Sequence, residues 1–261
     1  LSKKYDFKII EDASHGIGGK YRGKPIGNCR YSDISVFSFH PVKIITTGEG
    51  GMCTTNDPKI ANQLCLFRSH GITRHENEMT KESDGPWYYQ QIELGYNYRM
   101  TDINASLGLS QLDSLDQFIR KRHNIAQKYD LAFRNKPLIT PYQHKYNYSS
   151  YHLYIIRIKN TIKGLNKLNL FKSLRKSGIL VNLHYIPVYQ QPFYENFGYD
   201  SANYPESEKY YEEALSLPIH TLLKEEEQDF VIEKILNFLS KQETFIKNNV
   251  DENLEGFQTI F

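Results

Sequence analysis

The sequence is short of cysteine, of long apolar runs and of charge of one sign. Its three cysteines, Cys29, Cys53 and Cys65, form no Cys-x-x-Cys pair, which argues against a disulfide framework or a zinc site, so we expect buried or half-buried thiols. No apolar run approaches the roughly 18 residues of a membrane span. The net charge is only +2 and the basic residues are scattered, which disfavours nucleic acid or an anionic membrane as a partner. We expect a cytoplasmic protein that binds no metal.

What is present is the composition of an ordinary globular protein. The 261 residues are 39% hydrophobic and 24% charged, which is enough for a sizeable core and one or two domains. The chain begins with Leu1 rather than methionine, shortly before an expected core strand. We therefore expect that an upstream portion of the protein is missing from this sequence.

One lysine lies between an expected strand and a glycine-rich turn. The residues of Ile34–Phe39 are β-branched and aromatic, Lys43 follows them, and Met52–Thr55 predicts a further, hairpin-like strand after the glycines. A lysine in a nearly dry pocket has a lowered pKa, which makes it a useful nucleophile or proton carrier. On this segment alone, a solvated lysine at a strand end is an equally open interpretation.

Two acidic residues close the first expected strand. Phe7–Ile10 is short and apolar and ends in Glu11 and Asp12, as buried strands of a parallel sheet often do where such sheets bind ligands. A lysine, a carboxylate for a pyridine nitrogen and a hydroxyl for a phosphate are the parts that pyridoxal phosphate needs. Asp12 and Ser38 supply the latter two. Asp12 as an exposed loop residue and Ser38 as a solvent-facing strand residue stay open as alternatives.

The rest of the chain predicts helices around a long loop and then a second unit. Pro58–Phe67 reads as a capped helix, and residues 69–100 form a loop rich in tyrosine that also holds the single tryptophan. From Thr101, helical spacing runs to about Arg134, as in a helix that bridges two domains. Further elements are expected after it, namely strands at Tyr151–Ile158 and Ile179–His184 and helices at Leu168–Ser177, Glu206–Leu215 and Glu225–Leu239.

These elements predict an α/β protein. We expect residues 1–135 to form a larger domain, a mostly parallel sheet with helices and a bridging helix. Residues 136–242 are expected to form a smaller α+β domain. Residues 243–261 are expected to be a loosely held tail.

Several motifs together resemble one family. The motifs are Glu11–His15, Val36–Lys43, Thr46–Gly51, Phe67–Ile72 and Gly95–Ala105. They resemble the DegT-type sugar aminotransferases, fold-type I pyridoxal phosphate enzymes that act on nucleotide-linked keto sugars, and the similarity runs from Ile9 to about Leu239 in one register. Within that family, the chain is most similar to transaminases of pseudaminic acid synthesis in four further segments, namely Pro86–Tyr89, Ser149–Tyr154, Val181–Val188 and Gln191–Tyr194. The resemblance implies that residues 1–135 are the C-terminal portion of the family's cofactor-binding large domain.

The resemblance implies roles for the cofactor site. Lys43 matches the Schiff-base lysine and Asp12 the partner of the pyridinium nitrogen. His15 matches the residue beside the ring hydroxyl, and Ser38 matches a phosphate ligand. The implied cofactor is pyridoxal 5'-phosphate.

The resemblance also implies a homodimer. Asn97 and Arg99 match a loop that reaches into the neighbouring subunit's site, where the asparagine typically binds phosphate. The two subunits would then share their active sites.

Four residues match positions near the substrate. His184 and Tyr185 fall in the family's sugar-nucleotide loop, Tyr88 is a further candidate there, and His40 lies close to the cofactor. For all four, a packed or capping role stays open, because buried polar groups more often serve structure than ligand binding.

The implied reaction transfers an amino group from an amino acid, by family habit L-glutamate, to C4 of a UDP-linked 4-keto-6-deoxy-N-acetyl hexose. Related dehydratases carry histidine in place of this lysine, so Lys43 favours amino transfer. The alternatives are another nucleotide-sugar aminotransferase of the family and a catalytically silent interaction protein on the same scaffold. Since the family's phosphate loop and ring-stacking aromatic have no counterpart before Phe7, we expect the isolated chain to bind the cofactor weakly or not at all.

Overall fold

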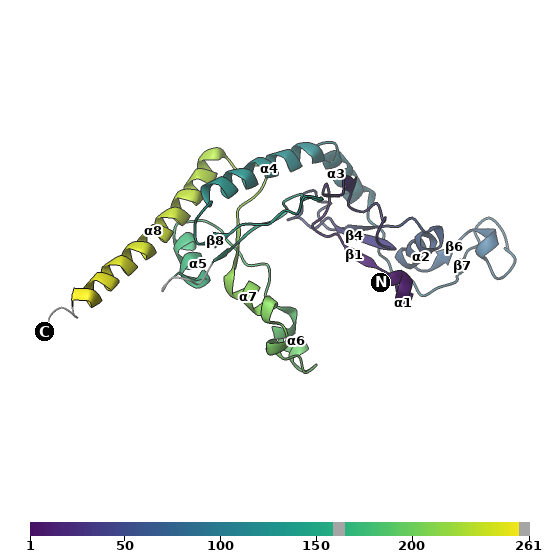
Figure 1. Cartoon of the computed structure of the whole chain (residues 1–261). Helices are drawn as coiled ribbons and strands as arrows, with labels where there is room; N and C mark the ends of the chain where they lie inside the picture. The colour runs from purple at the N-terminus through teal and green to yellow at the C-terminus, as the bar shows by residue number, and fades with distance from the viewer. Residues whose placement is uncertain (159–164, 256–261) are drawn as a thin grey trace. The chain divides into compact units, whose positions relative to one another are not determined.

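The strand that carries Asp12 lies in parallel beside the strand that leads to Lys43. β1 (Ile10–Asp12) pairs with β4 (Ile34–Ser38), and β5 (Gly51–Thr54) runs antiparallel along the other edge of β4 (Figure 1). β4 and β5 confirm the predicted strands. Lys43 lies in the connection between β4 and β5.

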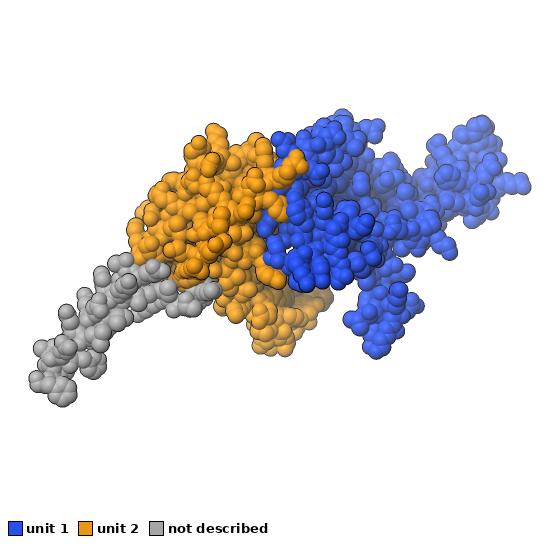
Figure 2. All heavy atoms as spheres, turned by 45° about the horizontal axis from the view of Figure 1, so that its top comes forward, with its two compact units in different colours: residues 1–119, 143–152 blue, residues 120–142, 153–261 orange. Residues whose placement is uncertain are grey.

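The computed structural model describes residues 1–158 and 165–255, with side chains described as far as residue 241. Two compact units make up the chain, and Figure 2 colours them separately. Unit 1 contains residues 1–119 and 143–152, and unit 2 contains residues 120–142 and 153–261. The predicted domain boundary at residue 135 stays a prediction.

The first strand begins later than predicted. Pairing starts at Ile10 rather than Phe7, because the backbone N–H of Ile9 donates to the side chain of Asp33 (2.8 Å) and not to a strand partner. The Ile9 carbonyl accepts hydrogen bonds from the backbone N–H groups of Asp33 and Ile34. Asp33 thereby fixes the point at which β1 enters the sheet.

A small apolar core supports this sheet in unit 1. Alternate residues of β4 are buried, as the period of a strand requires, so that Phe37 is 9% exposed and the following Phe39 is 6% exposed. Ala13 and Ile45 complete the buried cluster. The residues packed around it are Ile17, Ile26, Met100, Leu115 and Phe118.

The helices of unit 1 are close to those expected. α2 (Pro58–Arg68) begins at Asp57, whose carboxylate accepts hydrogen bonds from the N–H groups of Lys59 and Ile60. The predicted long helix from Thr101 is in fact two, α3 (Asp102–Leu112) and α4 (Leu115–Ala132), and α4 passes from unit 1 into unit 2 after residue 119. The hydroxyl of Thr101 caps α3, as predicted.

The remaining elements of unit 1 are short. α1 (Ser2–Tyr5) precedes β1, while β2 (Lys20–Tyr21) pairs with β3 (Lys24–Pro25) and with β9 (Asn147–Tyr148). Within the expected loop 69–100, β6 (Ile72–Thr73) and β7 (Gln90–Gln91) form a small hairpin around the 3-10 turn η1 (Glu76–Glu78).

Unit 2 is built on an antiparallel sheet. β10 (Tyr154–Ile158) lies between β8 (Leu138–Ile139) and β11 (Ala214–Leu217), and its alternate residues Tyr154, Ile156 and Ile158 are fully buried. The helices are α5 (Lys167–Lys176), α6 (Pro192–Glu195), α7 (Pro205–Glu213) and α8 (Glu225–Glu255), with the 3-10 turns η2 (Val188–Gln190) and η3 (Ser201–Asn203). α5 confirms the predicted helix.

Three predictions for unit 2 differ from the structure. The predicted strand Ile179–His184 is wrong, because only Asn182 makes a bridge, to Ser216. The predicted helix to Leu215 ends at Glu213, since Ala214–Leu217 instead pair with β10 as β11. α8 continues past Leu239 to Glu255 through residues expected to form the tail, and residues 256–261 lie outside the described part.

The α/β class is confirmed, although β1 with β4 is the single parallel pairing among the described strands. No helix in the described ranges is long and apolar enough to cross a membrane.

Of the cysteines, Cys29 is half-buried as expected, whereas Cys53 and Cys65 are exposed, which corrects the prediction of buried thiols.

Candidate active site

Asp12 stands at the carboxyl end of β1, where the chain leaves the parallel pair. Its carboxylate accepts a hydrogen bond from the backbone N–H of Ser14 (3.0 Å). Hydrogen bonds from the side chain and backbone of Ser14, helped by the nearby positive charges of His15 and Lys43, lower the pKa of Asp12. The side chain is exposed. The structure therefore offers an ionised, accessible carboxylate at this strand end.

Ser38 lies on the same face of the sheet as Asp12. Asp12 is opposite Val36 in the ladder, and Ser38 is two residues further along β4, so the period of a strand brings both side chains to one face. The Ser38 hydroxyl accepts a hydrogen bond from the backbone N–H of His40 (3.4 Å) and donates to no described residue. Its proton is available to an acceptor such as a phosphate oxygen.

Lys43 is half-buried in the connection between β4 and β5. It is followed by Ile44 and Ile45, which are 6% and 2% exposed and anchor the connection in the core. Burial lowers the pKa of Lys43, while the negative charge of Asp12 acts in the opposite direction. The two side chains are close enough to influence each other electrostatically. A lysine in this setting loses its proton more readily than a solvated one.

The connection that holds Lys43 is fixed at its base by Thr46. The side-chain amide of Gln111 on α3 makes two hydrogen bonds to the Thr46 backbone. Its Oε1 accepts from the Thr46 N–H (3.2 Å), and its Nε2 donates to the Thr46 carbonyl (2.7 Å). The Thr46 hydroxyl donates to the carbonyl of Phe39 (2.9 Å), and the N–H of Gly48 donates to that hydroxyl (2.9 Å). The sequence reasoning missed Gln111.

Further contacts hold the glycine turn against α3. The side-chain amide of Asn104 donates to the Glu49 carbonyl (3.1 Å). A Cβ added to Gly50 would come within 2.3 Å of Thr47 Oγ1, and one added to Gly108 within 2.8 Å of Thr47 Cγ2. Both glycines are therefore required by close approach. The signal that could have revealed this contact is a buried-face glycine in the middle of an otherwise good helix.

His15 and His40 flank this region in different ways. The ring of His15 is exposed and lies 4.3 Å from that of His152, and the His15 carbonyl accepts a hydrogen bond from Ser150 (2.9 Å). His40 is exposed, with Nδ1 accepting from the N–H of Val42 (3.3 Å) and Nε2 4.0 Å from Glu49. The structure brings His15 into the electrostatic surroundings of Asp12.

The other unit 1 candidates lie in the segment 69–100. Asn97 forms a backbone bridge with Ser69, and in the described part of the chain the Asn97 and Arg99 side chains make no hydrogen bond or ion pair. Tyr88 is half-buried and its hydroxyl accepts from Gln90 Nε2 (3.2 Å). The structure does not join these three residues to Lys43.

His184 and Tyr185 belong to unit 2. His184 Nδ1 is 2.7 Å from the Ser216 hydroxyl, and the His184 carbonyl accepts from Tyr210 (3.2 Å). Tyr185 is 64% exposed. His184 thus has a packing role within unit 2, and Tyr185 is free to meet a ligand.

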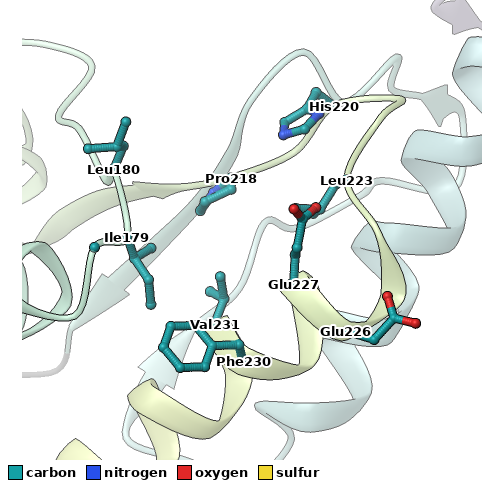
Figure 3. Close-up of a pocket in the computed structure, with 10 residues that line it drawn as sticks. Ile179, Leu180, Pro218, His220, Leu223, Glu226, Glu227, Phe230 and Val231 are labelled. Carbon is teal, nitrogen blue, oxygen red and sulfur yellow. The ribbon is translucent and has the colours of Figure 1, made fainter.

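An open hollow in unit 2 contains none of these candidates. It is an open, mainly apolar cavity of about 700 Å³ between the residues after α5 and the start of α8 (Figure 3). Ile179, Leu180, Pro218, Phe230 and Val231 supply its apolar lining, with His220, Glu226 and Glu227 at its edge. It has neither a lysine nor the charged pair of unit 1, so it is not the candidate active site.

Comparison with known proteins identifies the family. The model of the DegT/DnrJ/EryC1/StrS aminotransferase family matches residues 1–236. The chain belongs to this family. The resemblance inferred from the motifs is thereby confirmed, and the fold is that of the fold-type I aminotransferases.

Two curated relatives illustrate the range of similarity. The chain is 38% identical over 92% of its length to an uncharacterized protein of Methanocaldococcus jannaschii and 37% identical over 92% to UDP-4-amino-4,6-dideoxy-N-acetyl-beta-L-altrosamine transaminase of Campylobacter jejuni. It covers 62% and 61% of these relatives. The chain thus spans less than two thirds of their length.

Solved structures of the family have the same fold. Helicobacter pylori PseC, an aminotransferase of pseudaminic acid biosynthesis, is 33% identical with a TM-score of 0.82, over 92% of this chain and 62% of that one. The sugar aminotransferase Spr1654 of Streptococcus pneumoniae in its PLP-form is 33% identical with a TM-score of 0.79, over 93% and 60% of the two chains.

The residues of unit 1 fit the cofactor that this family uses. An ionised carboxylate suits a protonated pyridine nitrogen, and a lysine with a lowered pKa suits attack on an aldehyde. The Ser38 proton is available to a phosphate on the same face as Asp12. The described residues hold no group of three or more histidine, cysteine or acidic side chains placed to bind a metal.

We expect the amine of Lys43 to titrate below the ordinary lysine range. Because burial lowers its pKa and Asp12 opposes this effect, Asp12→Asn should lower the apparent pKa further. Both values can be measured from the pH dependence of Lys43 acetylation by trace acetic anhydride, followed by mass spectrometry with a model lysine peptide in the same tube. A Lys43 profile that coincides with the peptide, or an upward shift in Asp12→Asn, would contradict this electrostatic account.

We expect Gln111→Leu to loosen the Lys43 connection. The change removes both hydrogen bonds to Thr46 at nearly constant volume, and should cost about 1–3 kcal/mol of unfolding free energy. Amide hydrogen exchange in the peptide that covers residues 43–50 should become faster. Gln63→Leu, an exposed position on α2, is the matched control. Unchanged exchange in Gln111→Leu would show that α3 does not hold the connection.

Proposed function

We propose that the protein transfers an amino group to a nucleotide-linked keto sugar with the help of pyridoxal 5'-phosphate. The observation that carries the proposal is that a half-buried Lys43 with a lowered pKa and the ionised Asp12 lie close enough to influence each other electrostatically, at one end of a parallel strand pair. Membership of the aminotransferase family supports it. The relatives named as transaminases support the reaction type.

We further propose a specific amino donor and a specific acceptor sugar. The amino group would come from an amino acid, L-glutamate by the habit of the family, and go to C4 of a UDP-linked 4-keto-6-deoxy-N-acetyl hexose in pseudaminic acid or surface-glycan synthesis. The Campylobacter jejuni relative, named as an altrosamine transaminase, and PseC, an aminotransferase of pseudaminic acid biosynthesis, support this choice. The cytoplasm is the compartment that we propose for the reaction.

Each residue of unit 1 has a role that its surroundings allow. Bound pyridoxal phosphate supplies a carbonyl that exchanges amines and a ring that withdraws electrons from the reacting carbon. Asp12 would hold the pyridine nitrogen protonated, and Ser38 would donate to the phosphate. Lys43 would anchor the cofactor and would carry the proton between the two carbons that exchange it, because its lowered pKa lets it give up a proton more readily than a solvated lysine does.

The other candidates would bind and orient. His15 would lie beside the ring hydroxyl, and Asn97 and Arg99 would serve the site of the neighbouring subunit. The unengaged side chains of Asn97 and Arg99 are consistent with partners outside this chain. His40, Tyr88, His184 and Tyr185 are proposed as substrate contacts. Among these four, the exposure of Tyr185 makes it the best placed to contact a ligand.

We propose a homodimer, and α3 supplies the surface that supports it. Ile103 and Leu109 are 81% and 64% exposed, and Leu107 and Leu112 are also exposed. So much apolar surface on one short helix is unusual for a monomer and typical of an interface. Because α3 also holds the Lys43 connection through Gln111, an interface on this helix would involve an element that contacts the connection.

We expect Lys43→Ala and Lys43→Arg to lose amino transfer by on the order of 10²–10⁴-fold, the range for removal of a positioned proton-transfer group. The measurement is formation of 2-oxoglutarate from L-glutamate with a panel of UDP-linked keto sugars, at pyridoxal phosphate concentrations high enough to saturate the weak cofactor binding that we expect of this chain. Lys59→Ala, an exposed lysine on α2, should retain activity.

The panel also separates the alternatives. Turnover of a different nucleotide sugar would replace the substrate proposal while keeping the reaction type. Full activity of Lys43→Ala, or no turnover of any keto sugar by the wild-type chain, would reject amino transfer by this chain.

We expect Ile103→Lys with Leu107→Lys to convert a dimer into a monomer, because two charges would be buried in an apolar interface. Light scattering coupled to gel filtration gives the mass. Gln63→Lys on α2 is the control for added surface charge and should stay dimeric. A wild-type chain that is monomeric at high concentration, or a double variant that stays dimeric, would contradict an interface through α3.

A further inference from the structure

A second concave surface lies on the sheet face opposite to Asp12. Successive residues of a strand point to opposite faces, so Glu11 projects away from the face that carries Asp12. The Glu11 carboxylate accepts hydrogen bonds from the hydroxyls of Ser35 (2.6 Å) and Ser32 (3.4 Å). Glu11 also lines a cavity of about 590 Å³ in unit 1. That volume is in the range of small-molecule sites.

The β2–β3 hairpin forms one wall of this cavity, which we call the hairpin pocket. Its turn residues Arg22 and Gly23 have φ values of 49° and 72°, as a two-residue hairpin turn requires. The guanidinium of Arg22 lies 4.7 Å from the ring centroid of Tyr146, next to β9. Arg22 is therefore held by the neighbouring strand and does not extend freely into solvent.

Positive charge gathers on the pocket without carboxylate partners. Arg22, Lys24 and Arg30 all line it, and none of the three forms an ion pair within the described residues. Arg30 instead lies over the ring of Tyr31 at 5.6 Å. Glu11 is the acidic residue of the lining, and its charge is already engaged by serine hydroxyls. Three cations around one hollow raise the local concentration of anions.

Two tyrosines add a planar, apolar surface beside these charges. Tyr21 and Tyr31 are 36% and 55% exposed, and their rings meet edge to face at 5.6 Å. The exposed ring surface can stack on a flat heterocycle. Cations for phosphate, aromatic rings for a base and a carboxylate that can accept from a hydroxyl are the chemistry of a nucleotide site.

We propose that the hairpin pocket binds a nucleoside diphosphate, with the phosphates at Arg22, Lys24 and Arg30 and the base against Tyr21 and Tyr31. The size of the pocket and the net charge of +2 favour a single nucleotide over a nucleic acid. The site goes beyond the proposed amino transfer and does not depend on it, because its residues lie on the face away from Asp12.

Calorimetric titration of the full chain at low ionic strength tests the site with UDP, ADP and inorganic phosphate. The pocket variant is Lys24→Gln with Arg30→Gln. Its matched control is Lys59→Gln with Arg74→Gln, which removes two exposed cations elsewhere in unit 1, one of them also over a tyrosine ring. Circular dichroism verifies that both variants are folded. Tyr31→Ala tests the stacking surface, and Lys43→Ala tests the opposite face.

The site predicts that one nucleotide or both bind at least tenfold more tightly than phosphate. The pocket variant should lose at least tenfold in affinity, while the control variant and Lys43→Ala should keep it. Tyr31→Ala should weaken nucleotide binding by on the order of fivefold or more and leave phosphate unchanged. Absence of saturable nucleotide binding, equal affinity for phosphate, or full affinity in the folded pocket variant would overturn the assignment.

Discussion

The parallel pairing of β1 with β4 is the constraint on which the candidate site depends. Because the strands run in the same direction with Asp12 opposite Val36, the carboxylate and the Ser38 hydroxyl share a face at the same end of the sheet. The chain then turns within a few residues to present Lys43 near the carboxylate. An antiparallel pairing would place these two ends at opposite edges, and the mutual electrostatic effect of Asp12 and Lys43 would be lost.

The connection that carries Lys43 is held by hydrogen bonds to the end of β4 and to α3. The Phe39 carbonyl accepts from both the Thr46 hydroxyl and the Thr47 N–H, which closes the connection at its base. Gln111 then ties the same residue, Thr46, to α3. A lysine on an unsupported loop would be fully solvated and would have an ordinary pKa. Here the rigid support keeps it half-buried, so the chemistry of Lys43 depends on a glutamine far along the chain.

The two faces of the sheet differ in their charged groups. Around Asp12, hydrogen bonds and neighbouring positive charges stabilise a carboxylate. Around Glu11 on the other face, a carboxylate is engaged by hydroxyls while Arg22, Lys24 and Arg30 stay without carboxylate partners in the described structure. The alternation of a single strand thus separates a lysine–carboxylate pair from a cationic, aromatic hollow. This separation allows each face to be altered without touching the other.

The sequence by itself determined the local elements and the residues with chemistry. A β-branched and aromatic run predicted β4, the segment after the glycine turn predicted β5, and Asp57 with Pro58 predicted the start of α2. The motifs around Asp12 and Lys43 identified the family. Tertiary structure decided what local pattern leaves open. Ala214–Leu217 form a strand because they pair with β10. Ile179–His184 do not form a strand, because Asn182 alone of these residues bridges to another segment. Gln111 and the hairpin pocket emerged only from folding, because hydrogen bonds and charge clusters between residues distant in sequence have no local signature.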